Sequence, residues 1–245
     1  MIRRLTTLFI GTHLLGMLVP LLGNDALKRP VEAVQTERFE FAPGGVIRLA
    51  GTYGFLTVDG WDEPQVEIRI HKSTNGFYEL GRQEEAKRRL ESIRIVTERR
   101  PENELRITTI LPSRNGTWAP PLPPTTKAGV TVDYFIHAPR ASRLVVHHGS
   151  GQVLVSNMTG DVEATSRGGD ILLMLPDLSS YSIDAKSRFG TVSSDFAGDS
   201  HRWHLLGSRF IGAAPSGSHR IYVRTIKGGI VIQAAPADAD LGSRD

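Results

Sequence analysis

Two acidic residues are the strongest candidates for enzyme chemistry in this sequence. Glu163 and Asp184 hold equivalent outward positions in consecutive copies of a short repeat, which predicts that they lie on adjacent coils. Glycoside hydrolases need two carboxyl groups that converge on the sugar. Lys186 and Arg224 follow on the same face, however, and surface charges that neutralise one another give the same pattern. The sequence also lacks the nucleophile elbow, the zinc-protease motif and phosphate-binding glycine loops. We therefore predict no catalytic residue and no enzymatic activity.

Metal and cofactor binding find no better support in the spacing of acidic and histidine residues. Asp161 and Asp170 each follow a glycine, as in a ladder of calcium ligands. The other copies carry residues that cannot extend such a ladder from Asp170, namely Gln152, Thr191 and Gly229. His201 and His204 are three residues apart but lack a third ligand. We predict no metal and no cofactor, and we interpret the aspartates as turn residues.

Composition bounds the class of protein. The 245 residues are 40% apolar, which is enough for a core, and the 25 glycines and 14 prolines indicate many turns between short strands. The absence of cysteine excludes disulfides, thiolate metal sites and a lipid-modified N-terminal cysteine. A formal charge of +3 is too small an excess to indicate nucleic acid, which we do not expect as a partner.

The N-terminus predicts export. Arg3 and Arg4 precede a largely apolar run over residues 5–22, which is typical of a secretory signal. No clean cleavage site follows, so residues 1–26 are either a removed signal peptide or a retained membrane anchor. Both alternatives place the rest of the chain in the periplasm, the cell envelope or the cell surface, with membrane contact only through this segment if it is uncleaved.

A repeat of about twenty residues organises the second half of the chain. Residues 144–232 contain four copies of a strand, a turn and a second strand, with pivot glycines at Gly151, Gly169, Gly190 and Gly228. The positions seven and five residues before each pivot, and two after it, are apolar in every copy. A further copy pivots on Gly54, and a degraded one is expected within residues 199–215. The pattern predicts an all-β, single-stranded β-solenoid of stacked coils.

The remaining segments divide the chain. Residues 77–91 carry glutamate–arginine pairs four apart and predict one inserted surface helix. Residues 112–129 form a proline-rich loop, and 236–245 a disordered tail. We thus expect an N-terminal β region over 27–140 and the solenoid repeats over 141–235.

One outward column of the repeat is apolar. It comprises Leu154, Leu172 and Val231, with Met174 beside it. Such a stripe either packs against the N-terminal β region and its helix or is an exposed docking face.

The order of several motifs resembles the bacterial putative-adhesin domain family of unknown function. These motifs are GFLTVDGWD at 54–62, VDYFIHAP at 132–139, GDVEA at 160–164 and GGDI at 168–171, within a match over about 44–233. The resemblance implies an exported or membrane-tethered β-solenoid in which Trp61 belongs to a Gly-Trp-Asp turn. It implies no catalytic residues, because the family has none established.

Taken together, these patterns predict a non-enzymatic module of the cell envelope. We expect it to bind an envelope protein or glycan, as an adhesin or scaffold does, along a flat face. The first alternative is an accessory domain for envelope stress or signalling that acts by self-association. A β-helical carbohydrate-active enzyme is the second.

Overall fold

The computed structural model describes residues 29–76, 78, 80–111, 130–176, 181–203, 206–212 and 219–235. The predicted N-terminal segment (1–26), the proline-rich loop (112–129), the tail (236–245) and His204 lie outside this part of the chain. Among the described residues, no helix has the length and apolar character needed to span a bilayer.

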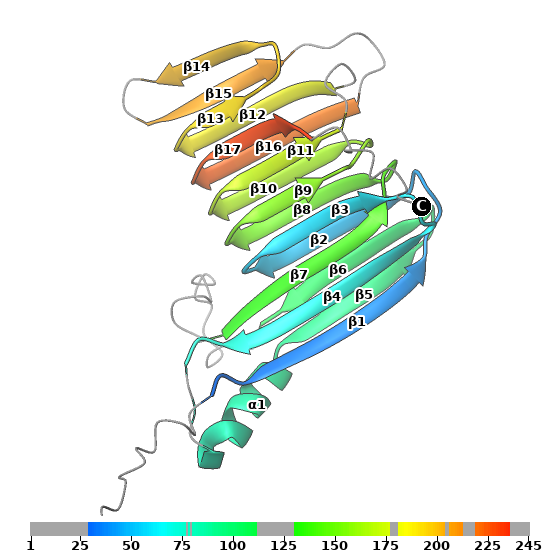
Figure 1. The fold of residues 1–245 in the computed structure, drawn as a ribbon, viewed down its shortest axis with the longest axis vertical. Coiled ribbons are helices and arrows are strands. Elements are labelled where there is room, and N and C mark those ends of the chain that lie inside the picture. Colours follow the sequence, from blue (N-terminus) through cyan, green and yellow to red (C-terminus); the bar gives the residue numbers. More distant parts are fainter. Residues whose placement is uncertain are drawn as a thin grey trace, which may run out of the picture.

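Two large β-sheets face each other and enclose one hydrophobic core (Figure 1). The eight-stranded sheet contains, in spatial order, β1 (Glu32–Glu40), β4 (Gln65–Thr74), β7 (Val130–Pro139), β3 (Leu56–Trp61), β9 (Val153–Ser156), β11 (Ile171–Leu175), β17 (Ile230–Ala234) and β13 (Val192–Ser194). The nine-stranded sheet contains β14 (Asp199–Trp203), β15 (Gly207–Gly212), β12 (Tyr181–Phe189), β16 (His219–Lys227), β10 (Val162–Gly168), β8 (Arg143–Ser150), β2 (Val46–Tyr53), β6 (Glu104–Ile110) and β5 (Arg94–Arg100).

The predicted single-stranded solenoid is wrong. Both sheets are mixed, because β1, β4 and β7 pair antiparallel in one sheet, as do β5 with β6 and β15 with both β12 and β14 in the other. The strands also do not stack in chain order, since β16 lies between β10 and β12, and β17 lies between β11 and β13. The result is a two-sheet, sandwich-like fold.

The apolar columns of the repeat nevertheless pair in register across the nine-stranded sheet. One buried row runs through Ile47, Leu144, Val162, Ile221 and Ile183 on five adjacent strands, all paired in parallel. Alternate residues on each strand point into the core, and a fully buried Val, Leu or Ile contributes ~1.5–3 kcal/mol. The columns specify which face of each strand is buried.

The pivot glycines form the turns by which each copy passes from the nine-stranded to the eight-stranded sheet. Four of the five have positive φ, for example +120° at Gly151 and +100° at Gly169, whereas Gly190 does not. A Cβ added at Gly169 would lie 1.8 Å from the carbonyl oxygen of Gly151. At Gly190 it would lie 2.1 Å from the carbonyl oxygen of Gly228. Stacked turns at this distance leave no room for a side chain.

Two segments differ from their predictions in kind or in length. Residues 199–212 contain no degraded coil, because β14 and β15 form an antiparallel hairpin against the edge of β12. The predicted helix over 77–91 is observed as a 3₁₀ turn, η2 (Leu80–Arg82), followed by α1 (Gln83–Glu91). Ala86 and Leu90 are the buried residues of α1, which packs against β1 and β4 at the end of the sandwich opposite β14 (Figure 1).

Candidate anion-binding groove

Two rows of outward side chains cross the outer face of the nine-stranded sheet. The middle row runs through paired residues on β8, β10, β16, β12 and β15, which are His147, Thr165, Arg224, Lys186 and Arg209. Two residues further along the strands, the register defines a rim row of Arg167, Ile226 and Arg188 on β10, β16 and β12. The residues between the rows, including Ser166, Ser187 and Thr225, are buried, so both rows point to solvent.

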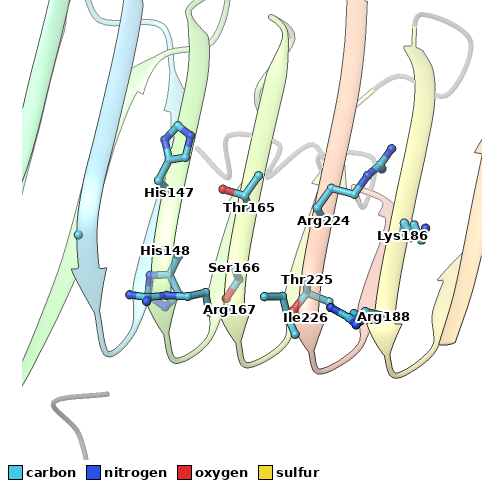
Figure 2. A pocket seen from close by; sticks show the side chains of 12 residues that line it. His147, His148, Thr165, Ser166, Arg167, Lys186, Arg188, Arg224, Thr225 and Ile226 are labelled. Atoms are coloured by element: carbon cyan, nitrogen blue, oxygen red, sulfur yellow. The ribbon is translucent and has the colours of Figure 1, made fainter. Parts of the chain in front are cut away.

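These rows line a groove of about 750 Å³ (Figure 2). We call it the basic groove and define it by its four cationic side chains, Arg167, Lys186, Arg188 and Arg224. The other lining residues are Gly51, His147, His148, Gly149, Thr165, Ser166, Thr225 and Ile226. No carboxylate is among the lining residues, so the groove presents cations, hydroxyls and one exposed aliphatic side chain.

Three of the four cations lack a carboxylate partner within the described part of the chain. Arg167 hydrogen-bonds the Tyr53 hydroxyl at 3.3 Å. The Lys186 ammonium lies 5.1 Å from the centre of the Trp203 ring, and the Arg188 guanidinium lies 5.3 Å from that of Phe189. Rings and hydroxyls orient these cations without neutralising them. Their charge therefore remains available to an anion.

Asp184 anchors the fourth cation, Arg224, from the outward row beside the groove. Its carboxylate accepts hydrogen bonds from Arg209 at 2.8 and 3.0 Å and from Arg224 at 2.5 Å. Burial by itself would raise the pKa of Asp184, but the hydrogen bonds and charges of the two arginines outweigh it and lower this pKa to about 2. Asp184 is therefore ionised at neutral pH, and it positions Arg224 rather than donating a proton.

The expected Glu163–Asp184 pair is not formed. Tyr222 on β16 lies between the two residues in the cross-strand row, so the carboxylates are two strand spacings apart, roughly 10 Å. Glu163 instead forms an ion pair with Arg143 at 3.7 Å. Lys186 and Arg224 are paired neighbours on one face, as the sequence predicts, but they belong to the basic groove.

The buried wall of the groove is uncharged at neutral pH. Nδ1 of His148 lies 2.8 Å from the Thr52 hydroxyl, and its Nε2 has no hydrogen-bond partner among the described residues. Burial lowers the pKa of His148 to about 4, against the smaller opposing effect of the nearby backbone of Ser150 and Gly151. Because His147 is exposed while His148 is buried, the two rings point to opposite faces, as alternation in a strand requires.

The predicted docking residues lie on the opposite surface of the molecule. Leu154, Leu172 and Val231 are paired on β9, β11 and β17, and Met174 lies two residues beyond Leu172. All four are half-buried on the outer face of the eight-stranded sheet. They share no pocket with the basic groove.

The remaining candidates are structural. Oδ1 of Asp161 accepts the Arg220 amide at 2.9 Å, and that of Asp170 accepts the Gly229 amide at 2.7 Å. Trp61 lies at the end of β3, not in a turn, and stacks on His137 at 5.1 Å. In the described ranges, no group of three His, Asp or Glu residues is arranged to hold a metal ion.

Sequence reasoning missed Arg167 and Arg188. The signal was present, because the outward positions four and two residues before the four pivot glycines of residues 144–232 carry Lys or Arg in four of eight cases. These eight residues are His147, Gly149, Thr165, Arg167, Lys186, Arg188, Arg224 and Ile226. The pairing of β10 and β12 with β16 brings the cations of separate copies together.

Comparison with known proteins gives no family model and no curated protein that matches the chain. A putative cell adhesion protein from Clostridium sporogenes is similar in structure at 12% identity, covering 84% of this chain and 100% of that one, with a TM-score of 0.46. A putative adhesin from Bacteroides fragilis is similar at 9% identity, covering 82% of this chain and 97% of that one, with a TM-score of 0.30. A putative lipid binding protein from Parabacteroides distasonis is similar at 10% identity, covering 66% of this chain and 64% of that one, with a TM-score of 0.19.

Two of these three structures carry adhesion names, in line with the resemblance predicted from the sequence. No family model or sequence relative reproduces the motifs of that resemblance.

Proposed function

We propose that this chain is a non-enzymatic binding module of the cell envelope, and that the basic groove binds an acidic envelope component such as an anionic glycan. The observation that carries the proposal is the cluster of Arg167, Lys186 and Arg188, which have no carboxylate partner in the described structure. These unpaired cations lie on β10 and β12, with the cationic Arg224 of β16 between them, and they repel one another, so the folded chain gains from an anion that lies across them.

The carboxylates near the groove support binding in preference to catalysis. A glycoside hydrolase needs a general acid with a raised pKa, whereas that of Asp184 is lowered to about 2 by two arginines. Glu163 lies two strands away and is paired with Arg143. The absence of enzymatic activity and the location in the envelope, which rests on the pattern of residues 1–26, stay predictions.

Binding of the full chain to polygalacturonate tests the proposal, with neutral dextran as the uncharged probe. We expect polygalacturonate alone to bind, with affinity falling as salt screens the charges. The triple variant Arg167→Gln, Lys186→Gln, Arg188→Gln should lose roughly tenfold to a hundredfold in affinity, since each exposed charge contact is worth ~0.5–1 kcal/mol.

A matched control removes three positive charges elsewhere on the same sheet. The triple variant Arg48→Gln, Arg100→Gln, Arg106→Gln changes net charge equally, but each of these arginines is already paired with Glu98 or Glu104. If the two triple variants lose affinity equally, binding reflects overall charge and the groove is not the site. Equal affinity for dextran and polygalacturonate would overturn the proposal outright.

Self-association is a second candidate, and the eight-stranded sheet is the observation that favours it. Phe135 is 41% exposed on its outer face, in the same cross-strand row as Thr57 and the half-buried Leu154. Sedimentation of the full chain over a hundredfold concentration range tests this candidate. A constant monomer mass would reject it, and a dimer that Leu172→Asp dissociates would support it.

A further inference from the structure

We infer that the rim of the basic groove is a docking surface for a lipid bilayer that carries anionic phosphate headgroups. The inference rests on the proposed function, because the same cations are used, and it names the acidic component. It is a membrane contact separate from the one that residues 1–26 would make if they are retained as an anchor.

Exposed apolar side chains gather at this rim. Ile226 and Phe189 are each 41% exposed and Trp203 is 50% exposed, although all three are large hydrophobic residues. Ile226 lies between Arg167 and Arg188 in the rim row (Figure 2). Exposed apolar residues therefore alternate with cations.

The row continues onto the terminal hairpin. Register places Gly207 of β15 beside Arg188, and Gly207 pairs with Trp203 of the edge strand β14. The sequence across five strands is thus cation, aliphatic, cation, glycine and aromatic, over roughly 19 Å at the usual strand spacing. Gly207 adds no side chain to the row, and the Trp203 ring at its end lies 5.1 Å from the Lys186 ammonium.

This combination fits a bilayer interface better than a soluble polyanion. A soluble polyanion would interact favourably with the cations, but it would not explain why Ile226 is exposed. A bilayer would bind both the cations and the apolar side chains. Anionic headgroups attract Lys and Arg, and aliphatic and aromatic side chains enter the boundary between headgroups and acyl chains. Tryptophan favours that boundary because its ring is apolar and its N–H is polar.

Phe135 provides an internal control on the opposite sheet. It is as exposed as Ile226, at 41%, but its cross-strand neighbours are Thr57 and Arg69, so only one cation adjoins it. If apolar exposure alone determined binding, both surfaces would enter a bilayer.

Site-specific labelling tests the inference in the full chain, which contains no cysteine of its own. Ile226→Cys and Phe135→Cys are labelled separately with an environment-sensitive nitrobenzoxadiazole dye and mixed with vesicles of phosphatidylcholine containing 30% phosphatidylglycerol. We expect emission to rise severalfold at 226 and to stay unchanged at 135, as well as at 226 with phosphatidylcholine alone. A local probe is used because residues 1–26 are common to both variants. No change at 226, or equal changes at both positions, would overturn the inference.

Vesicle affinity separates the two chemical parts of the rim. The variant Arg167→Gln, Arg188→Gln should bind roughly twenty-five-fold more weakly, since each cation near an anionic bilayer is worth about fivefold. Ile226→Ser and Trp203→Ser should each weaken binding severalfold and leave its salt dependence unchanged, whereas Phe135→Ser should have no effect. If the two apolar substitutions leave vesicle affinity intact, the surface does not dock on lipid.

Failure of this inference differs from failure of the proposed function. Binding to polygalacturonate without binding to anionic vesicles would retain the groove as a site for a soluble or wall-bound polyanion and reject the bilayer. Loss of both would reject the groove itself.

Discussion

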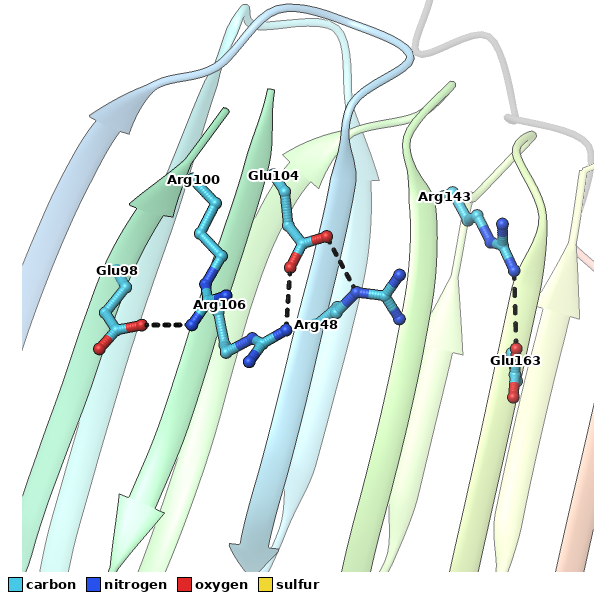
Figure 3. Close-up of polar contacts among 7 residues, drawn as sticks. All are labelled: Arg48, Glu98, Arg100, Glu104, Arg106, Arg143 and Glu163. Carbon is cyan, nitrogen blue, oxygen red and sulfur yellow. Dashed lines mark hydrogen bonds and ion pairs between the residues drawn. The ribbon is translucent and has the colours of Figure 1, made fainter. Parts of the chain in front are cut away.

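Two regions of the same sheet face show opposite uses of charge. On β5, β6, β2, β8 and the start of β10, four arginines and three glutamates form what we call the balanced cluster, in which each arginine is paired with a glutamate (Figure 3). Its members are Arg48, Glu98, Arg100, Glu104, Arg106, Arg143 and Glu163. On β10, β16, β12 and β15, five cations have Asp184 as their one carboxylate partner among the described residues, because Glu163 of the adjoining row is paired with Arg143 of β8. Both regions belong to one hydrogen-bonded sheet, so the difference in charge pairing comes from the outward side chains and not from the backbone.

The comparison shows where the fold leaves charge unpaired. In the balanced cluster, the hydrogen bond from Arg48 lowers the pKa of Glu104, so the acid stays ionised and the cations are neutralised. Exposed pairs of this kind add little stability, and their main effect is to remove net charge from the surface. The basic groove lacks this neutralisation, which a purely structural surface would gain from having.

The largest expected effect comes from the turn that supports both regions. Gly169→Ala would place a Cβ 1.8 Å from the Gly151 carbonyl oxygen at a φ of +100°, so we expect a loss of ~3 kcal/mol or more in the free energy of unfolding. Urea denaturation measures it.

The neighbouring residue is the matched control. A Cβ at Gly168 would meet only the Ser150 Cβ, at 3.8 Å, so Gly168→Ala should change stability by less than ~1 kcal/mol. If both variants lost a similar free energy of unfolding, close packing of the stacked turns would not be what stabilises the sheet that carries the two regions.

The second expected effect lies at β8, where the two regions meet. The pKa of His148 is about 4 when folded and 6.5 in the unfolded chain, so its neutral form favours the fold. The contribution is complete above pH 6.5 and is lost as pH falls toward 4, by ~3 kcal/mol. Unfolding free energies measured between pH 7 and pH 4 should show this loss.

Substitutions of the two adjacent histidines separate the buried ring from the exposed one. His148→Gln should remove the steep part of the pH dependence between 6.5 and 4, while His147→Gln should leave it in place. Carboxylates titrate equally in both variants. An unchanged profile in His148→Gln would mean that the buried ring is not the titrating group.

How far the sequence predicts this molecule depends on which side of the strand is considered. Inward columns repeat because the core requires apolar residues, and they predict the register that joins Leu144, Val162 and Ile221. They do not predict strand order, because Val, Ile and Ala are interchangeable within a column. The inserted position of β16 and the antiparallel hairpin over 199–212 depend on contacts that no column records.

The outward residues of the basic groove also could not be grouped from the sequence without the strand order. The sequence predicts Lys186 and Arg224 as neighbouring charges on one face, and Arg224 is neutralised by Asp184, whereas Lys186 has no carboxylate partner among the described residues. Arg167 and Arg188 come from copies that are separated in the sheet by β16. A surface cluster assembled through strand order becomes visible only when that order is known, whereas the half-buried stripe through Leu172 follows from a single column.

The third expected effect concerns the anchoring acid of the groove. Asp184→Asn removes the charge that holds Arg209 and Arg224, and should cost ~1–2 kcal/mol at pH 7, a figure that allows for solvent screening of a side chain 28% exposed. Because its folded pKa is lowered to about 2, this contribution is present above the unfolded pKa of 3.8 and is lost as pH falls from there toward 2.

The same variant sharpens the contrast between the regions. Asp184→Asn should tighten polygalacturonate binding while it destabilises the fold, because the groove gains one net positive charge. Glu98→Gln in the balanced cluster should alter stability by less than ~0.5 kcal/mol, since its pair with Arg100 is exposed. Weaker polyanion binding in Asp184→Asn would mean that the position of Arg224 matters more than the charge of the groove.

The smallest expected effect is a change in the free energy of unfolding that has opposite signs in the two regions. Lys186→Gln and Arg188→Gln relieve repulsion among the cations of the basic groove, so the free energy of unfolding should rise by ~0.2–0.5 kcal/mol at low salt, whereas Arg48→Gln should lower it by a similar amount. At 1 M salt both differences should disappear, because the Debye length falls to about 3 Å. A gain in stability when the cations of the groove are removed is what a binding site would show. If Arg188→Gln instead lost stability at every salt concentration, its guanidinium would be a packing element over Phe189 and the contrast with the balanced cluster would be one of structure alone.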